Sequence, residues 1–597
     1  MNTKATADAQ NILWDLADLY QSLEDPKIES DLKTITEKTA KFVQTYKGKI
    51  STLSSEELKK AYQDIETLLT PLYAISQYAG LRFAIETDNS EIKAFNAKID
   101  EFSSKISNEI LFFDLELGQV DQKIIQPHLD SKVLKNYHYS LIRSVETAKY
   151  NLSEKEEQLS NLKDLTGKDA LQKLYEELTS SFEFKFKIDG KVQTLNGSQL
   201  RNLRLHPDKD VRRKAMRLFY SRYEENQLVI STLYNQILKS VAIERDLRGY
   251  TSPIQVKNIS NDLDESTVEL LHTVTTDSNR LVHDYYSLKK KLLNLPDMTL
   301  ADIYAPLPKA DSSYTYTQAK KIVLESFAAF DQEIHDMAKL MFDQNRIHAP
   351  VLPKKRGGAF CSGSTPEVKP YVLLNFMAKP RDVSTMAHEL GHAIHDMLSA
   401  QKQTLTNFHP ILPLAETASV FAEMLVTDQL LKTETSKAAK IALLTDKLED
   451  IFATSHRQNM FSRFEMVTHK EISGRLLDAN ELCDLYTKEL KLMFGKSIKY
   501  PKEYQWEWST IPHIFESPFY VHSYNFGNLL VMALYQQYLE EGKSFIPKYK
   551  ALLSMGSAAR PIEITQIVGA DINDERFWQK SIMYIESLLN QLKDLTK

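Results

Sequence analysis

The sequence has few of the features that mark several large classes of protein. Only two cysteines, Cys361 and Cys483, occur in 597 residues, too few for a disulfide framework and not spaced as a metal clip. No apolar run approaches the roughly 18 residues needed to span a bilayer. Residues 1–10 lack the basic and apolar regions of a secretory signal. We therefore expect a soluble, cytoplasmic protein that does not contact a membrane.

Positive charge is not in excess either. Lys and Arg total 74 against 80 Asp and Glu, which gives a formal net charge of -6. Proteins that bind nucleic acids use a surplus of Lys and Arg to neutralise the phosphates. Nucleic acid is therefore not an expected partner.

Glycine is scarce, with 17 residues, and long stretches place apolar residues three or four positions apart. This periodicity predicts a mainly helical fold. The clearest strand signal is residues 182–192, where apolar and polar residues alternate around Asp189-Gly190. It predicts a β-hairpin, with a domain boundary just beyond it. We expect a helical N-terminal domain of residues 1–195 and a second domain, residues 196–597, that holds the motifs described next.

An apolar run in the second domain, Tyr371–Met377, has the length and the flanking prolines of a strand. At the edge of a sheet, such a strand could hold an extended peptide by main-chain hydrogen bonds. In the middle of a sheet, it would be a buried core strand. The sequence favours neither interpretation, because edge position is not visible in a single sequence.

The following segment predicts a helix that begins near Asp382 or Ser384 and contains His388, Glu389 and His392. With 3.6 residues per turn, the two histidines lie on one face and can reach a single metal ion. Neutral imidazoles bind Zn²⁺ without cancelling its Lewis acidity, while the free carboxylate takes a proton from the attacking water and passes it to the leaving amine. The pattern predicts one catalytic Zn²⁺ per chain, although so short a motif also arises by chance from surface or core histidines.

A catalytic zinc site needs a third protein ligand and an open position. We expect this ligand to be Glu416, at the start of the next helix. Glu423 lies seven residues on, about 10 Å away, so it is either a support for a zinc-bound histidine or a surface charge. His395 lies too far along the helix from His388 to share the ion and is expected to be structural. His409, in the loop between the helices, is the rival third ligand.

A further group of candidates lies nearer the C-terminus. Tyr520 and Tyr524 are spaced for one face of a helix, and His513 precedes them. Phenol and imidazole groups can donate hydrogen bonds to the oxyanion that forms when water attacks a carbonyl. Tyrosines at this spacing are also common in packing interfaces, and the spacing alone favours packing.

Several segments together carry a resemblance to a known family: Trp14–Tyr20, Gly358–Cys361, Tyr371–Met377, His388–His395, Ala415–Ser419, and His513 with Pro518–Tyr524. In this combination the sequence resembles the thimet oligopeptidase and oligoendopeptidase F group of zinc peptidases, and most closely its oligoendopeptidase F branch. The resemblance implies a mainly α fold of two helical lobes around a deep substrate channel, with a small β element beside the motif helix. It also implies that His388, His392 and Glu416 bind zinc, that Glu389 is the base, and that the substrates are short unstructured oligopeptides.

The expected activity is that of a zinc-dependent metalloendopeptidase, in which His513 with Tyr520 or Tyr524 stabilises the tetrahedral intermediate. The alternative is a carboxypeptidase or dipeptidyl carboxypeptidase on a related helical zinc fold, which would need a cationic anchor for the terminal carboxylate of the substrate. The presence of Glu389 disfavours a peptide-binding scaffold without catalysis. A purely structural zinc site is disfavoured because such sites usually have four protein ligands. The sequence makes no prediction about oligomeric state.

Overall fold

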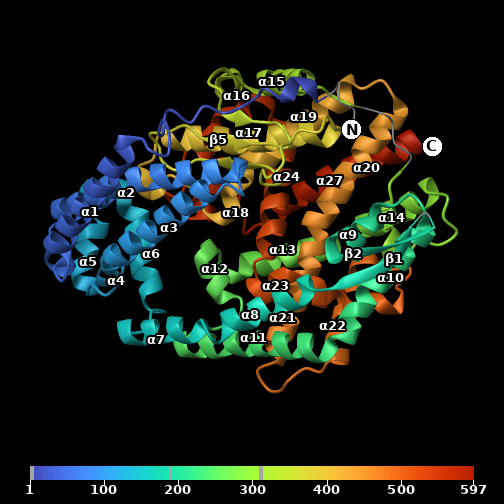
Figure 1. Ribbon diagram of the computed structural model, residues 1–597, viewed down its shortest axis with the longest axis horizontal. Helices are drawn as coiled ribbons and strands as arrows, with labels where there is room; N and C mark the ends of the chain where they lie inside the picture. The colour runs from blue at the N-terminus through green and yellow to red at the C-terminus, as the bar shows by residue number, and fades with distance from the viewer. Residues whose placement is uncertain (1–5, 189, 308–312) are drawn as a thin grey trace. The chain divides into compact units, whose positions relative to one another are not determined.

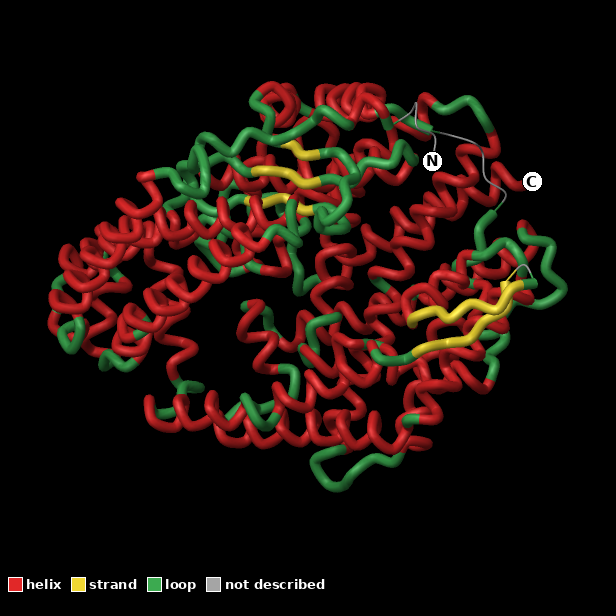
Figure 2. Tube along the Cα trace, in the orientation of Figure 1, coloured by secondary structure: helices red, strands yellow, loops and turns green. Residues whose placement is uncertain are grey.

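The computed structural model describes residues 6–188, 190–307 and 313–597. Helices dominate this part of the chain and strands are few (Figures 1 and 2). The predicted mainly helical fold is therefore confirmed. Within the same residues, no helix combines the length and the apolar character that crossing a membrane would require.

Contacts divide the chain into two compact units, and each unit is assembled from three separate segments. The first unit contains Met1–Lys149, Asp311–Glu434 and Gln537–Asp571. The second unit contains Tyr150–Ala310, Thr435–Gln536 and Ile572–Lys597. The boundary expected at residue 195 falls inside the second unit, because the hairpin beside it packs on the helices that follow in the chain. The channel between lobes that the resemblance implies stays a prediction.

The first unit begins with a bundle of long helices whose apolar faces share one core. Helix α2 starts at a capping box, in which Ser54 and Glu57 satisfy each other's main-chain N–H groups. The core of this bundle also contains Tyr371 and Leu373, so it continues into the strand that precedes the motif helix.

The N-terminal helices of the unit are α1 (Pro26–Tyr46), α2 (Ser55–Ile85), α3 (Ser90–Ile110), α4 (Phe112–Gly118), α5 (Gln122–Leu129) and α6 (His138–Ala148). Its later helices are α15 (Tyr316–Phe330), α16 (Gln332–Asp343), α17 (Pro380–Ala400), α18 (Leu412–Ala415), α19 (Thr417–Thr433), α25 (Phe545–Leu553) and α26 (Pro561–Gln566).

A small sheet lies beside α17 in the first unit, with strand order β3-β5-β4 (Figure 2). Its central strand β5 (Tyr371–Leu373) pairs in parallel with β3 (Ile347–His348) and antiparallel with β4 (Phe360–Ser362). All three residues of β5 are fully buried. The edge position considered for the run Tyr371–Met377 is therefore wrong, and only its first three residues form a strand. A continuous apolar run is typical of a strand buried on both faces. In the described sheet, β4 is the strand next to α17 that keeps one edge unpaired.

The second unit is also helical and carries the predicted hairpin. Strands β1 (Glu183–Ile188) and β2 (Lys191–Asn196) are antiparallel, with Glu183 opposite Asn196 and Ile188 opposite Lys191. The hairpin is confirmed, while the turn residue Asp189 lies outside the described residues. The helices of this unit are α7 (Glu154–Asp164), α8 (Lys168–Ser180), α9 (Gly197–Asn202), α10 (Lys209–Glu225), α11 (Gln227–Arg248), α12 (Gln255–Asn261), α13 (Glu265–Asp277), α14 (Asn279–Leu292), α20 (Lys437–Thr454), α21 (His456–Glu471), α22 (Ala479–Phe494), α23 (Pro512–Glu516) and α27 (Glu575–Thr596). Helix α24 (His522–Glu541) belongs to the second unit as far as Gln536 and to the first unit from Gln537 onward.

Candidate metal centre

Helix α17, which carries the HExxH motif, begins at Pro380, earlier than the predicted start near Asp382 or Ser384. Pro380 suits the first helical position, where its missing N–H would have no partner within the helix. Asp382 lies in the first turn, and its Oδ2 accepts hydrogen bonds from the main-chain N–H groups of Met377 and Lys379, at 2.8 and 2.9 Å. The predicted start was too late because Asp382 is the third residue of the helix, from which it accepts a hydrogen bond from the main-chain N–H of the cap residue Lys379 instead of being the cap itself.

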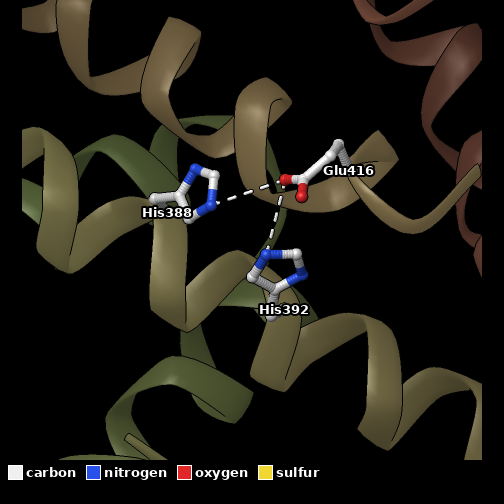
Figure 3. Close-up of side chains that lie close together, drawn as sticks. All are labelled: His388, His392 and Glu416. Carbon is white, nitrogen blue, oxygen red and sulfur yellow. Dashed lines mark ion pairs between the residues drawn. The ribbon is translucent and has the colours of Figure 1, made fainter. Parts of the chain in front are cut away.

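The structure brings His388, His392 and Glu416 together (Figure 3). One candidate ligand atom of each side chain lies within 4.8 Å of the others. Nε2 of each histidine is 3.4 Å from Oε2 of Glu416, and the two imidazole rings are nearly perpendicular, at 82°. Ligand atoms bonded to one tetrahedral zinc ion at about 2.0–2.1 Å lie about 3.3 Å apart. The two nitrogen-to-oxygen distances and the donor types therefore fit a zinc ion.

Glu416 lies between α18 and α19 rather than within a helix, at the N-terminal end of α19. Its Oε2 accepts a 2.6 Å hydrogen bond from the hydroxyl of Ser419, one turn into that helix. Burial by itself raises the pKa of Glu416, but the neighbouring His392 and His388 outweigh it and lower the pKa to about 2. Glu416 is therefore an ionised, oriented carboxylate at neutral pH.

Glu423 supports His388 from the side opposite to Glu416. Nδ1 of His388 lies 2.7 Å from Oε1 of Glu423. Burial alone lowers the pKa of His388, but the hydrogen bond and charge of Glu423 raise it to about 9. The contact holds the ring so that Nε2 faces Glu416, which is the supporting role rather than that of a surface charge.

Glu423→Ala is expected to weaken zinc binding by about 10- to 100-fold, because His388 loses the acceptor that orients its ring. Titration of the metal-free protein with a competing zinc indicator measures this change. Glu367→Ala is the matched control, since Glu367 is exposed in the same unit. Equal zinc affinities for the two variants would contradict the orienting role of Glu423.

Gly391, between the two histidines of the motif, permits α17 and α19 to pack closely. A Cβ atom built on Gly391 would lie 2.6 Å from both the carbonyl oxygen of Ala418 and the Cα of Ser419. Main-chain atoms cannot move aside as a flexible side chain can. The glycine therefore sets the distance at which Glu416 reaches the histidines.

Gly391→Ala is expected to lower the free energy of unfolding by about 1–3 kcal/mol and to reduce zinc content, because the added methyl group pushes α19 away from α17. Thermal unfolding and zinc analysis of the purified variant check both effects. Gly80→Ala is the matched control, because Gly80 is an exposed residue inside α2 with no atom within 4 Å of a built Cβ. That control should be neutral or slightly stabilising. Normal stability and full zinc content in Gly391→Ala would contradict the packing argument.

A pocket of about 370 Å³ lies beside the metal-binding group and is lined by its two histidines. Glu389 is only 6% exposed, and burial raises the pKa of its carboxyl group. It lines the same pocket as His388 and His392. The lining residues are Ala359, Phe360, Cys361, Gly363, His388, Glu389, His392, His395, Asp396, His409, Pro410 and Ala415.

The two histidines considered as alternatives lie outside the metal-binding group. His395 is 3% exposed, and burial lowers its pKa to about 3, so it is a neutral side chain held against the main chain of Ala415. Among the residues that the structure describes, His409 lines the pocket but is not part of the group formed by His388, His392 and Glu416.

The sequence reasoning did not single out Asp396, which lines the same pocket. Burial raises the pKa of its carboxyl group to about 7. Its position four residues after His392 could have revealed it, because that spacing continues the face of α17 on which His388 and His392 lie.

The second unit brings the aromatic side chains of the C-terminal group together. The His513 ring is stacked on Tyr520 with centroids 6.0 Å apart, and Tyr520 and Tyr524 are 5.2 Å apart, edge to face. Tyr524 lies in α24, but Tyr520 lies in the turn before it, so the two tyrosines do not share a helix as predicted. Phe519 in this turn has φ of 60°, and its N–H donates a 2.7 Å hydrogen bond to Glu465. The left-handed residue prevented the helix from extending back to Tyr520.

Comparison with known proteins supports the resemblance seen in the sequence. The family model described as Peptidase family M3 matches residues 202–584, and the one described as Oligopeptidase F matches residues 116–184. The oligoendopeptidase F homolog of Borreliella burgdorferi is 26% identical over 592 residues, 98% of each chain. Oligopeptidase PepF of Bacillus subtilis is 25% identical over 587 residues, 98% of this chain and 87% of its own.

Solved structures agree with this relationship. A crystal structure from Chlamydophila abortus has a TM-score of 0.90 at 25% identity and covers 98% of both chains. The oligoendopeptidase-F structure from Enterococcus faecium shares the fold, with a TM-score of 0.70 at 22% identity over 96% of this chain and 99% of its own. Since the M3 family model covers well over half of the sequence, the chain belongs to peptidase family M3 and is a metallopeptidase.

Proposed function

We propose that this protein is a zinc-dependent endopeptidase that cuts short, unstructured oligopeptides at internal bonds. The observation that carries the proposal is the group His388, His392 and Glu416, whose two histidines line one pocket with the buried Glu389. Two imidazoles and one carboxylate leave a coordination position open, which distinguishes a catalytic zinc site from a closed structural one. Relatives named oligoendopeptidase F support the endopeptidase assignment.

The roles of the residues follow from their positions. Bound zinc would supply Lewis acidity to polarise the scissile carbonyl. Glu389 takes a proton from the attacking water and delivers it to the leaving amine, and burial raises its pKa toward the range that such an exchange needs. Glu416 is the third ligand, facing Nε2 of both histidines, and Glu423 holds the His388 ring from its Nδ1 side.

The unpaired edge of β4 supplies a place for the substrate. Phe360 and Cys361 of this strand line the pocket that contains Glu389. We propose that an extended peptide adds to this edge by main-chain hydrogen bonds, which the central strand β5 cannot provide. Main-chain pairing requires an unfolded substrate, so folded proteins should resist cleavage.

The direct test is digestion of a flexible peptide of roughly ten residues that is blocked at both ends. The proposal predicts an internal cut that disappears when a chelator removes the metal and returns when zinc is restored. A carboxypeptidase or dipeptidyl carboxypeptidase would leave the peptide intact, and the unblocked form of the same peptide would then be cut. That outcome would replace the proposal by the alternative.

We also propose that His513 and Tyr520 or Tyr524 donate hydrogen bonds to the developing oxyanion. Replacing the responsible tyrosine by phenylalanine is expected to lower kcat by about a hundredfold with little change in KM, because the hydrogen bond forms chiefly in the transition state. Steady-state kinetics of Tyr520→Phe, Tyr524→Phe and His513→Ala measure this, with zinc content and melting temperature as checks. Tyr304→Phe is the control, since the Tyr304 ring packs under Arg204 in the same unit. Wild-type kcat in all three variants would show that this group does not act in catalysis.

A further inference from the structure

Asp396 lies in the pocket that contains Glu389, and no Lys or Arg is among the residues that line this pocket. It follows His392 by one turn on the same face of α17 and lines the pocket together with Cys361 and Gly363. Among the residues that the structure describes, His392 is the one side chain that lowers the pKa of Asp396 against the effect of burial. A carboxylate in such a position is costly to keep ionised unless a cation accompanies it.

The carboxylate lies against the chain that leaves β4. A Cβ atom built on Gly363 would be 2.1 Å from Oδ2 of Asp396, so the glycine leaves the space that the carboxylate occupies. Gly363 directly follows Ser362, the last residue of β4. Asp396 therefore lies next to the strand on which we propose that the substrate binds.

The separation of Asp396 from the catalytic residues indicates which part of a substrate it would contact. Along α17, Asp396 is about 6 Å from His392 and about 10 Å from Glu389, given a rise of 1.5 Å per residue. An extended peptide advances about 3.3 Å per residue. Asp396 is thus within reach of a substrate residue about two or three positions from the cleaved bond.

We propose that Asp396 selects substrates that carry a positive charge within about three residues of the cleaved bond. The charge is a Lys or Arg side chain or a free amino terminus, since each offers N–H donors to a carboxylate. A cation would form a charge-assisted hydrogen bond with the half-buried carboxylate, whereas an acidic residue would be repelled. This specificity rests on the proposed endopeptidase function and adds a residue preference to it.

The test compares peptides that differ at one position beside the cleaved bond, where arginine is replaced by citrulline or by glutamate. Citrulline keeps the shape of arginine and removes its charge. Wild-type protein is expected to cut the arginine peptide about 10- to 100-fold better in kcat/KM than the citrulline peptide. Asp396→Asn should reduce this ratio to about one, chiefly by lowering kcat/KM for the arginine peptide, with zinc content unchanged. Glu367→Gln, the same chemical change at an exposed site, should keep the wild-type ratio.

Each outcome separates this proposal from the endopeptidase assignment. Equal cleavage of the arginine and citrulline peptides by wild-type protein, tested at every position within three residues of the bond, together with no effect of acetylating the amino terminus, would overturn the role of Asp396 and leave the endopeptidase function intact. An unchanged arginine-to-citrulline ratio in Asp396→Asn would overturn it as well. Equal cleavage of those two peptides with slower cleavage after acetylation would identify the terminal amine as the cation. Failure of the zinc-loaded wild-type protein to cut any peptide would instead contradict the proposed function. The wild-type comparison can overturn the proposal even if Asp396→Asn does not fold.

Discussion

Glu389→Gln is expected to retain one zinc ion per chain and to lose about a thousandfold or more in kcat. Glutamine has almost the same shape but cannot accept a proton at neutral pH, and residue 389 is not one of the three side chains grouped for metal binding. Zinc analysis, thermal unfolding and peptide kinetics on one preparation measure the effect. The variant removes a buried carboxylate whose pKa is already raised by burial, so stability should not fall.

Glu367→Gln is a suitable control for this prediction, because it makes the same chemical change on an exposed residue. It should keep wild-type kcat. If Glu389→Gln kept more than about a tenth of wild-type kcat with full zinc, another group would have to act as the base.

Removing a proposed metal ligand should have the opposite signature, in which activity is lost because zinc is lost. His388→Ala, His392→Ala and Glu416→Ala each delete one of three ligands, and each is expected to weaken zinc binding on the order of 100- to 1,000-fold. Glu416→Ala is the most informative, because the motif itself does not contain this residue. Zinc content after dialysis, together with affinity from indicator competition, measures the loss.

His409→Ala is the matched control for the ligand variants. His409 lines the pocket and was the rival third ligand in the sequence, but it lies outside the described group of metal-binding side chains. It should therefore keep its zinc. Full zinc in Glu416→Ala combined with loss of zinc in His409→Ala would exchange the two assignments.

The candidate site could be predicted where its chemistry depends on local geometry. The spacing of His388 and His392 on one helix is fixed by 3.6 residues per turn, so their convergence needed no tertiary information. Glu416 was predicted because a catalytic zinc site with two histidines needs one more ligand, and the structure places it near both histidines. The alternating pattern of the hairpin at residues 182–192 was equally local.

Features that depend on the neighbours of a segment could not be predicted in the same way. The apolar run at residues 371–377 indicated a strand, but its central place in the sheet depends on two partners, β3 and β4, that no local pattern identifies. The importance of Gly391 appears only when α19 is seen against α17. The close approach of Asp396 to Gly363 is likewise visible only in the folded structure.

In the C-terminal group, the spacing correctly predicted that two tyrosines are neighbours but wrongly predicted that they share one helix. Tyr520 and Tyr524 lie side by side as the four-residue spacing predicts, yet Tyr520 belongs to a turn. The main-chain N–H of Phe519 is held there by Glu465, a buried residue on α21 that is more than fifty positions away. A long-range hydrogen bond of this kind overrides local helix propensity and leaves no signal in the local sequence.

The central claim, that His388, His392 and Glu416 hold a zinc ion beside Glu389, is tested most directly by diffraction from zinc-loaded crystals at wavelengths on either side of the zinc absorption edge. The account predicts one anomalous peak per chain, about 2.0–2.2 Å from Nε2 of each histidine and from a carboxylate oxygen of Glu416. A stoichiometric zinc peak elsewhere, with these three side chains free of metal, would contradict it.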